Sequence, residues 1–110
     1  MRHDETRIYR RALELVGISK QVMDNLPTGY GFLADQLRRA SSSVLLNFSE
    51  GYPKHSVREQ KRFFQIAKAS SYEVAAILDV AEQFGVIEEG LHERGKDAAD
   101  HVAAMLTRFR

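Results

Sequence analysis

The 110-residue sequence has no cysteine, no tryptophan and only two prolines. Without cysteine, disulfide bonds, thiolate metal sites and cysteine nucleophiles are excluded. Long apolar runs are also missing: the longest, such as Val74 to Leu78, are far shorter than the roughly 20 residues of a membrane-spanning helix. The first residues lack the apolar stretch of a signal peptide. We therefore expect one cytoplasmic domain, residues 1–110, that does not interact with a membrane.

Pro27, Pro53 and the glycines divide the sequence into four segments, and each segment has apolar residues at helical spacing. Ser56 and Glu59 have the spacing of a capping box, which marks a helix start, and Gly85 suits a left-handed C-cap. The sequence thus predicts an all-α fold, an elongated antiparallel up-down-up-down four-helix bundle. The expected helices cover residues 5–25, 30–52, 56–85 and 88–109.

Two residues are unusual on the predicted apolar stripes. Gly95 lies on the stripe of the fourth helix, which indicates close helix packing or, alternatively, a break in the helix. Asn47 lies on the stripe of the second helix, where a buried amide must find hydrogen-bond partners. We interpret Asn47 as a residue that sets the helix register or bonds to loop backbone, with a ligand-binding role as the alternative.

Short motifs in the second and third predicted helices carry a resemblance. They are Gln36-Leu37-Arg38-Arg39-Ala40, Asn47-Phe48-Ser49-Glu50-Gly51-Tyr52, Arg62-Phe63, Ile66-Ala67, Ser70-Ser71-Tyr72-Glu73 and Gly85-Val86-Ile87. This stretch resembles the bacterial four-helix-bundle family of proteins encoded in intervening sequences of large-subunit ribosomal RNA, which includes the accessory variability determinant proteins of diversity-generating retroelements. The resemblance implies a ring-like homopentamer, with nucleic acid or a nucleic-acid enzyme as partner. Members of this family mostly lack a defined activity.

Charged residues on neighbouring helices are expected to meet. Antiparallel helices place residues at equal heights when their numbers lie symmetrically about the connecting turn, so the sequence predicts which charges are level. If such pairs are half-buried they specify register, and the alternative is that each charge projects into water. The predicted ion pairs are Glu73 with Arg38 or Arg39, and Glu50 with Arg58 or Arg7.

The near-neutral net charge of +1 hides an axial asymmetry. The predicted bundle brings residues 1–12, 46–64 and 104–110 to one end, where ten basic and four acidic residues give +6 and leave −5 elsewhere. A basic face attracts phosphate backbones, and Tyr9, Tyr52 and Phe64 are near enough to stack on bases. A solvated surface with core aromatics is the alternative. The predicted phosphate contacts are Arg7, Arg10, Arg11, Lys54, Arg58, Lys61 and Arg62.

The helices also carry more large apolar residues than one core can use. Successive helical residues turn by about 100°, so adjacent apolar residues cannot all face the same core. Exposed apolar patches usually mark interfaces, so the surplus favours a homo-oligomer. The alternative is that these helices are covered on a wide face within one chain, so that the extra apolar residues are buried in its core. The candidate interface residues are Leu13, Leu45, Leu46, Phe64 and Val80.

The sequence offers little for catalysis or metal binding. A di-iron bundle needs Glu-x-x-His on two helices, and this spacing occurs only once, at Glu89 and His92. The four histidines are spread along the predicted bundle, and Asp97 and His101 have the spacing of a surface pair. We therefore expect no enzyme activity, no metal and no cofactor. The predicted function is a homo-oligomeric scaffold whose basic end binds RNA, DNA or a nucleic-acid-handling protein; the alternative is a structural or protein-interaction oligomer.

Overall fold

Four α-helices form the protein in a computed structural model that describes residues 2–109. Helix α1 covers His3–Asn25, α2 Gly31–Gly51, α3 Val57–Gln83 and α4 Glu89–Arg108. Each bound lies within two residues of the one predicted from the sequence. The described residues contain no strand, and the molecule measures 45 × 21 × 18 Å. The predicted elongated all-α bundle is therefore confirmed.

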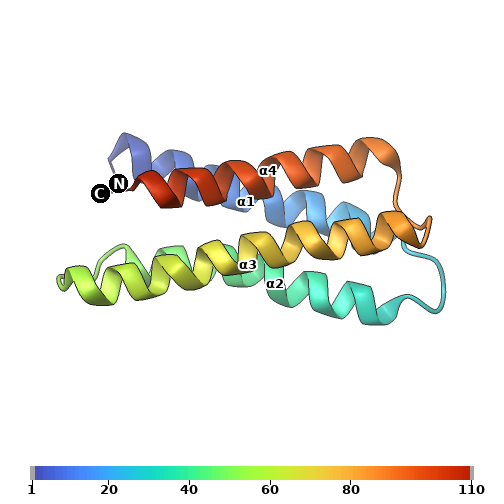
Figure 1. The fold of residues 1–110 in the computed structure, drawn as a ribbon, viewed down its shortest axis with the longest axis horizontal. Helices are drawn as coiled ribbons and strands as arrows, with labels where there is room; N and C mark the ends of the chain where they lie inside the picture. The colour runs from blue at the N-terminus through green and yellow to red at the C-terminus, as the bar shows by residue number, and fades with distance from the viewer. Residues whose placement is uncertain (1, 110) are drawn as a thin grey trace.

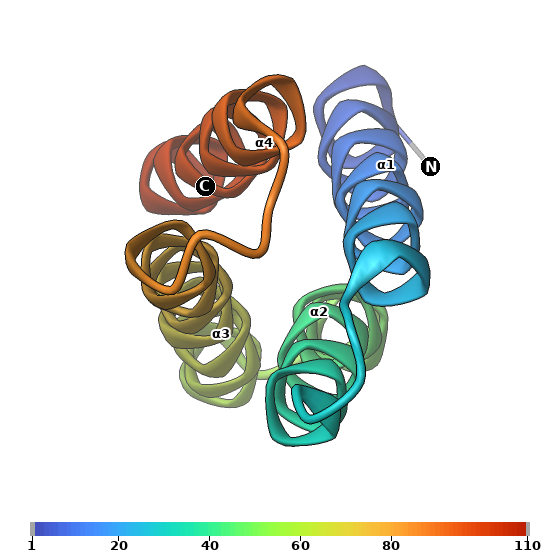
Figure 2. The same cartoon turned by 90° about the vertical axis from the view of Figure 1, so that its right-hand side faces the viewer.

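The helices run up and down in chain order, and each packs against two neighbours (Figure 1). Helix α1 contacts α2 and α4, and α3 contacts the same two helices, so the four surround one core (Figure 2). The two termini and the α2–α3 turn lie at one end, and the other two turns lie at the opposite end. This topology brings the three predicted basic segments together; we call this the basic end. Within residues 2–109, no helix has the length and apolar character needed to cross a bilayer.

The core has an aromatic stack near the basic end. Phe48 of α2 is completely buried and stacks on Phe64 of α3, with ring centroids 5.4 Å apart. Phe109, which follows α4, meets Phe64 edge-on at 4.8 Å. Phe64 is therefore a core residue, and its prediction as an interface residue was wrong: it turns inward because the ends of α2 and α4 supply aromatic partners.

Local signals set the helix ends. The Ser56 hydroxyl accepts a hydrogen bond from the Glu59 backbone N–H at 3.2 Å, which confirms the N-cap of α3. The Glu59 side chain pairs with Arg62 instead of returning to Ser56, so the capping box is only half formed. Gly85 has φ +71°, and the Val86 N–H donates to the Ala81 carbonyl, which confirms the left-handed end after α3.

Two glycines permit close helix contacts. A Cβ on Gly51 of α2 would lie 2.7 Å from the Phe63 Cβ of α3. A Cβ on Gly95 of α4 would lie 2.5 Å from a Leu78 methyl group of α3. Because Gly95 lies inside an unbroken helix, its predicted role in close packing is confirmed and the predicted alternative of a helix break is excluded.

Candidate nucleic-acid interface

Exposed cations from three helices gather at the basic end. Arg7 lies on α1, Arg58 and Lys61 lie on the first turns of α3, and Arg108 ends α4. All four are exposed, and none forms an ion pair with a side chain that the structure describes. Their positive charges therefore face solvent without neutralisation by those side chains. The same holds for Arg10 on α1 and Lys54 in the α2–α3 turn.

Surface hollows lie among these cations. One runs between the start of α3 and the end of α4, and its lining includes Lys61, Arg108, Phe64 and Phe109. Another lies along the first turns of α3 beside Arg58 and Lys61. A smaller one lies between α1 and α4, beside Arg7 and again Arg108. Arg108 thus borders two of these hollows, although it was not among the predicted phosphate contacts. The sequence signal for Arg108 was its position in the last turn of the fourth predicted helix, which lies at the same end of the bundle as Arg7 and Arg58.

Arg11 and Arg62 are less available than the sequence analysis assumed. Arg11 donates to Asp97 Oδ2 at 3.0 Å and to His101 Nδ1 at 3.1 Å, and it also pairs with Glu14. Only 20% of its side chain is exposed, so Arg11 joins α1 to α4 and is not a free phosphate ligand. Asp97 and His101 do share a face, and they use it to hold Arg11.

A half-buried phenylalanine lies under two of the cations. The Arg62 guanidinium is 4.5 Å from the centre of the Phe63 ring, and Lys54 Nζ is 5.5 Å from it. Arg62 also pairs with Glu59 at 3.2 Å, so it has two contacts within the protein. These cation–π contacts fix the Lys54 and Arg62 charges beside the α2–α3 turn.

The aromatic residues suggested for base stacking lie at the basic end but differ in exposure. Tyr9 and Tyr52 are half-buried, and Tyr9 packs against the core. The Tyr52 ring lies 6.3 Å from that of Phe48. Phe64 is 7% exposed and enclosed by other rings, so a base has no access to its face. Of these three residues, only the two tyrosines therefore have ring surface on which a base could stack.

One of the two predicted ion pairs forms. Arg39 of α2 binds the carboxylate of Glu73 of α3, which confirms that pair and raises the pKa of Arg39. Arg38 pairs with Asp35 on its own helix, 2.8 Å away. Glu50 is exposed and forms no ion pair with Arg7 or Arg58 among the described residues, so that prediction was wrong. Equal height along the bundle is not enough to form an ion pair, because both side chains must also point into the same groove between the helices.

Asn47 takes part in a polar connection between α2 and α3. Its side-chain amide donates to the Ser43 carbonyl and to Ser43 Oγ, both at 2.9 Å. Ser43 Oγ in turn lies 2.8 Å from Ser70 Oγ on α3. The partners are thus helical, not loop backbone. The connection joins the two helices at one height, in keeping with the predicted register role.

The predicted interface residues divide into exposed and covered ones. Leu13, Leu46 and Val80 are 50%, 64% and 41% exposed, whereas Leu45 is half-buried against the core. Beyond the predicted residues, the outer side of α3 carries a stripe of apolar residues that we call the α3 stripe. Its members are exposed apolar residues spaced three or four apart: Ile66, Ala69, Tyr72, Ala76 and Val80.

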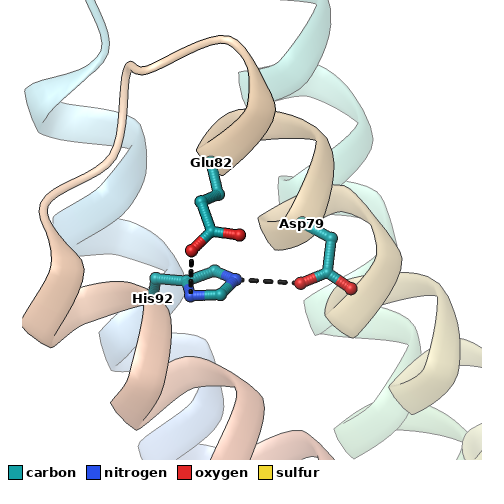
Figure 3. Close-up of side chains that lie close together, drawn as sticks. All are labelled: Asp79, Glu82 and His92. Atoms are coloured by element: carbon teal, nitrogen blue, oxygen red, sulfur yellow. Dashed lines mark hydrogen bonds and ion pairs between the residues drawn. The ribbon is translucent and has the colours of Figure 1, made fainter.

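A histidine and two carboxylates meet near the α3–α4 turn (Figure 3). His92 of α4 lies between Asp79 and Glu82 of α3, and one ligand atom from each lies within 4.8 Å of the others. Lys96 donates to Asp79 at 2.7 Å; this bond, together with the one to His92, holds the pKa of Asp79 below its usual value. The signal in the sequence is the α3–α4 turn, since equal heights about that turn place Asp79 level with His92.

The fold and surface therefore define a class: a small all-α four-helix bundle with one basic end. The sequence profile of the 23S rRNA-intervening sequence protein family matches residues 4–108. The chain belongs to this family, as the motif resemblance indicated.

Among solved structures, the chain is similar to a protein of unknown function from the S23 ribosomal protein family of Bacteroides thetaiotaomicron. The TM-score is 0.82 with 16% sequence identity, over 90% of this chain and 94% of that one. At this identity the similarity supports the fold alone. No curated protein sequence matches the chain.

Proposed function

We propose that this chain is a non-enzymatic, homo-oligomeric scaffold whose basic end binds the phosphate backbone of RNA or DNA. The observation that carries the proposal is the set of exposed cations, Arg7, Arg58, Lys61 and Arg108, around the hollows at the ends of α1, α3 and α4. They come from three helices and lie at one end of the molecule. Clustered positive charge attracts a polyanion and releases its counterions on binding.

Membership of the family supports a connection with ribosomal RNA genes, since its members are described as 23S rRNA-intervening sequence proteins. The proposal that the ligand carries phosphate groups is drawn from the exposed charges of this chain. Because most polar side chains around the hollows are cations, with only Gln60 and Thr107 as neutral polar residues of the one between α3 and α4, the interface would contact phosphate groups more than base edges. Binding that depends on structure and salt, with little sequence preference, is the expected form.

Fluorescence anisotropy with a structured RNA and a duplex DNA, at about 50 and 200 mM salt, tests this function. The informative variant is Arg58→Glu with Lys61→Glu, because these two side chains are exposed and unpaired among the described residues. Arg62 is left intact because it packs on Phe63. The control is Lys20→Glu with Arg94→Glu, which makes the same charge change on exposed residues toward the opposite end. It also removes the Lys20–Asp24 ion pair on the surface of α1, so circular dichroism checks that the variant is folded.

The native protein is expected to bind tightly at low salt and to lose affinity steeply as salt rises. Removing two phosphate contacts should lower the slope of log K against log salt by about 2. The control should keep the native slope and affinity. No binding at about 50 mM salt, or equal loss in both variants, would contradict the proposal and favour the structural or protein-interaction oligomer.

Self-association is the second part of the proposal, and the α3 stripe supports it. The exposed Leu13 on α1 and Leu46 on α2 belong to other helices, so the molecule has apolar surface on more than one side. Contacts between unlike surfaces of identical chains close into a ring when the rotation between subunits divides a full turn evenly. Homo-oligomerisation through these surfaces, as a pentamer by the family resemblance, would repeat the basic end around an axis and multiply its charge.

A further inference from the structure

We propose that Asp79, Glu82 and His92 form a binding site for a divalent transition-metal ion of the zinc type. The three side chains converge from two helices, with Asp79 and Glu82 one turn apart on α3 and His92 in the first turn of α4 (Figure 3). Nothing in the proposed function of the basic end requires this cluster, which lies by the α3–α4 turn at the other end of the bundle.

The distances suit coordination after small side-chain rotations. His92 Nε2 is 2.9 Å from Asp79 Oδ1, and His92 Nδ1 is 3.3 Å from Glu82 Oε2. An ion binds only one nitrogen of the ring, so one of the two carboxylates must rotate toward the nitrogen that the other one contacts (Figure 3). Zinc bonds of about 2.0–2.2 Å place neighbouring ligand atoms roughly 3–3.5 Å apart. One atom from each of the three residues already lies within 4.8 Å of the other two. The three side chains are therefore close enough to share one ion once a carboxylate has rotated.

The burial pattern is that of an open site with one rigid ligand. Only 13% of the His92 side chain is exposed, so its ring is held by packing between α3 and α4. Asp79 and Glu82 are about half exposed, at 49% and 51%, so an ion can enter from solvent. Three protein ligands leave the remaining coordination positions to water.

The donor set selects the kind of metal. One imidazole nitrogen and two carboxylate oxygens suit zinc and similar divalent ions, whereas magnesium and calcium prefer oxygen ligands alone. Lys96 holds the other oxygen of Asp79, Oδ2, at 2.7 Å and leaves Oδ1 directed at His92. A contact of this kind orients a metal-binding carboxylate, although its positive charge also lowers the affinity for a cation. The two carboxylates outweigh that single charge.

Isothermal titration calorimetry of the metal-free full-length chain with Zn²⁺ is the first test, with visible absorption of the Co²⁺ form as the second. We expect one ion per chain and Co²⁺ bands of a nitrogen–oxygen site. Zinc should also raise the melting temperature, and EDTA should reverse the rise, because an ion that binds only the folded state stabilises it. Absence of stoichiometric binding would overturn the proposal.

Three variants separate the site from incidental binding. His92→Gln should lower zinc affinity by more than about tenfold, a loss comparable with those seen when metal sites are perturbed. His55→Gln, in the exposed α2–α3 turn, should bind like the native chain. Lys96→Gln removes a contact between α3 and α4 without removing a ligand, and it should retain zinc binding. Circular dichroism checks that each variant is folded.

The outcomes discriminate clearly. If His55→Gln loses as much affinity as His92→Gln, zinc binds histidines in general and the proposed site is refuted. If His92→Gln binds zinc as tightly as the native chain, the ion lies elsewhere and the proposed site is refuted. Failure of nucleic-acid binding at the basic end would leave the zinc result unchanged.

Discussion

At the scale of single residues, local sequence does not determine which side chains of one type are buried. Phe64 and Leu46 both follow another large apolar residue, and both are predicted interface residues. In the fold, Phe64 is 7% exposed between two aromatic rings and Leu46 is 64% exposed. The difference comes from where α2 and α4 end, because those ends supply Phe48 and Phe109. The energetic cost of removing each side chain should differ in the same way.

Replacing Phe64 by alanine should lower the free energy of unfolding by about 3–5 kcal/mol, because it leaves a cavity in the aromatic stack. Leu46→Ala should change it by no more than about 0.5 kcal/mol within a subunit, since the leucine is mostly exposed. Urea unfolding followed by circular dichroism at one fixed protein concentration measures both. Equal losses would show that Leu46 is covered in solution as completely as Phe64.

At the scale of helices, glycine has different roles at positions that look alike in the sequence. Gly17 lies inside α1 with nothing within 4 Å of a Cβ placed there. Gly51 ends α2 against Phe63, whose Cβ cannot move without its backbone. Gly51 therefore sets the closest approach of α2 and α3, whereas Gly17 only weakens its own helix.

Alanine substitution at the two glycines should have opposite effects on stability. Gly17→Ala should raise the free energy of unfolding by about 0.5–1 kcal/mol, because alanine favours the helix and meets no neighbour. Gly51→Ala should lower it by about 1–3 kcal/mol, because the added methyl group forces α2 away from α3. Thermal melts of the two variants beside the native chain test this. Stabilisation by both would mean that the α2–α3 contact yields easily.

At the scale of the whole molecule, the surface charges and apolar residues are arranged along and around the bundle axis. The turns bring the cations of α1, α3 and α4 to one end, and the α3 stripe runs along the side. An assembly through the sides of the bundle would leave both ends open, so self-association and phosphate binding are compatible. The oligomer can therefore be tested without changing the basic end.

Val80→Glu should dissociate the proposed oligomer, because it places a charge in the α3 stripe at a position that is 41% exposed in the single chain. Light scattering after size-exclusion chromatography should give a multiple of the 12.5 kDa chain mass for the native protein and a lower mass for the variant. Gln21→Glu, which adds the same charge on an exposed part of α1, is the control. A native protein that runs as a single chain would refute the proposed assembly.

The sequence by itself determined the helices, their order and the end at which basic residues gather. Helical periodicity, two prolines and the glycines set the bounds, and short turns allow only neighbouring antiparallel packing. It also predicted the Arg39–Glu73 pair, because the two residues lie at equal heights on antiparallel helices. The close approach at Gly95 was predicted because this glycine lies on the apolar stripe of its own helix.

Only the tertiary structure decided which charges are available and which residues converge. Rotation of each helix about its own axis turns Arg11 toward Asp97 and His101, and leaves Glu50 unpaired among the described residues. The same rotation brings Asp79 and Glu82 to His92. The packing of the whole core fixes that rotation, because every helix must fit against two neighbours at once. The periodicity of a single helix shows which side is apolar, but not the exact angle at which that side meets its neighbours.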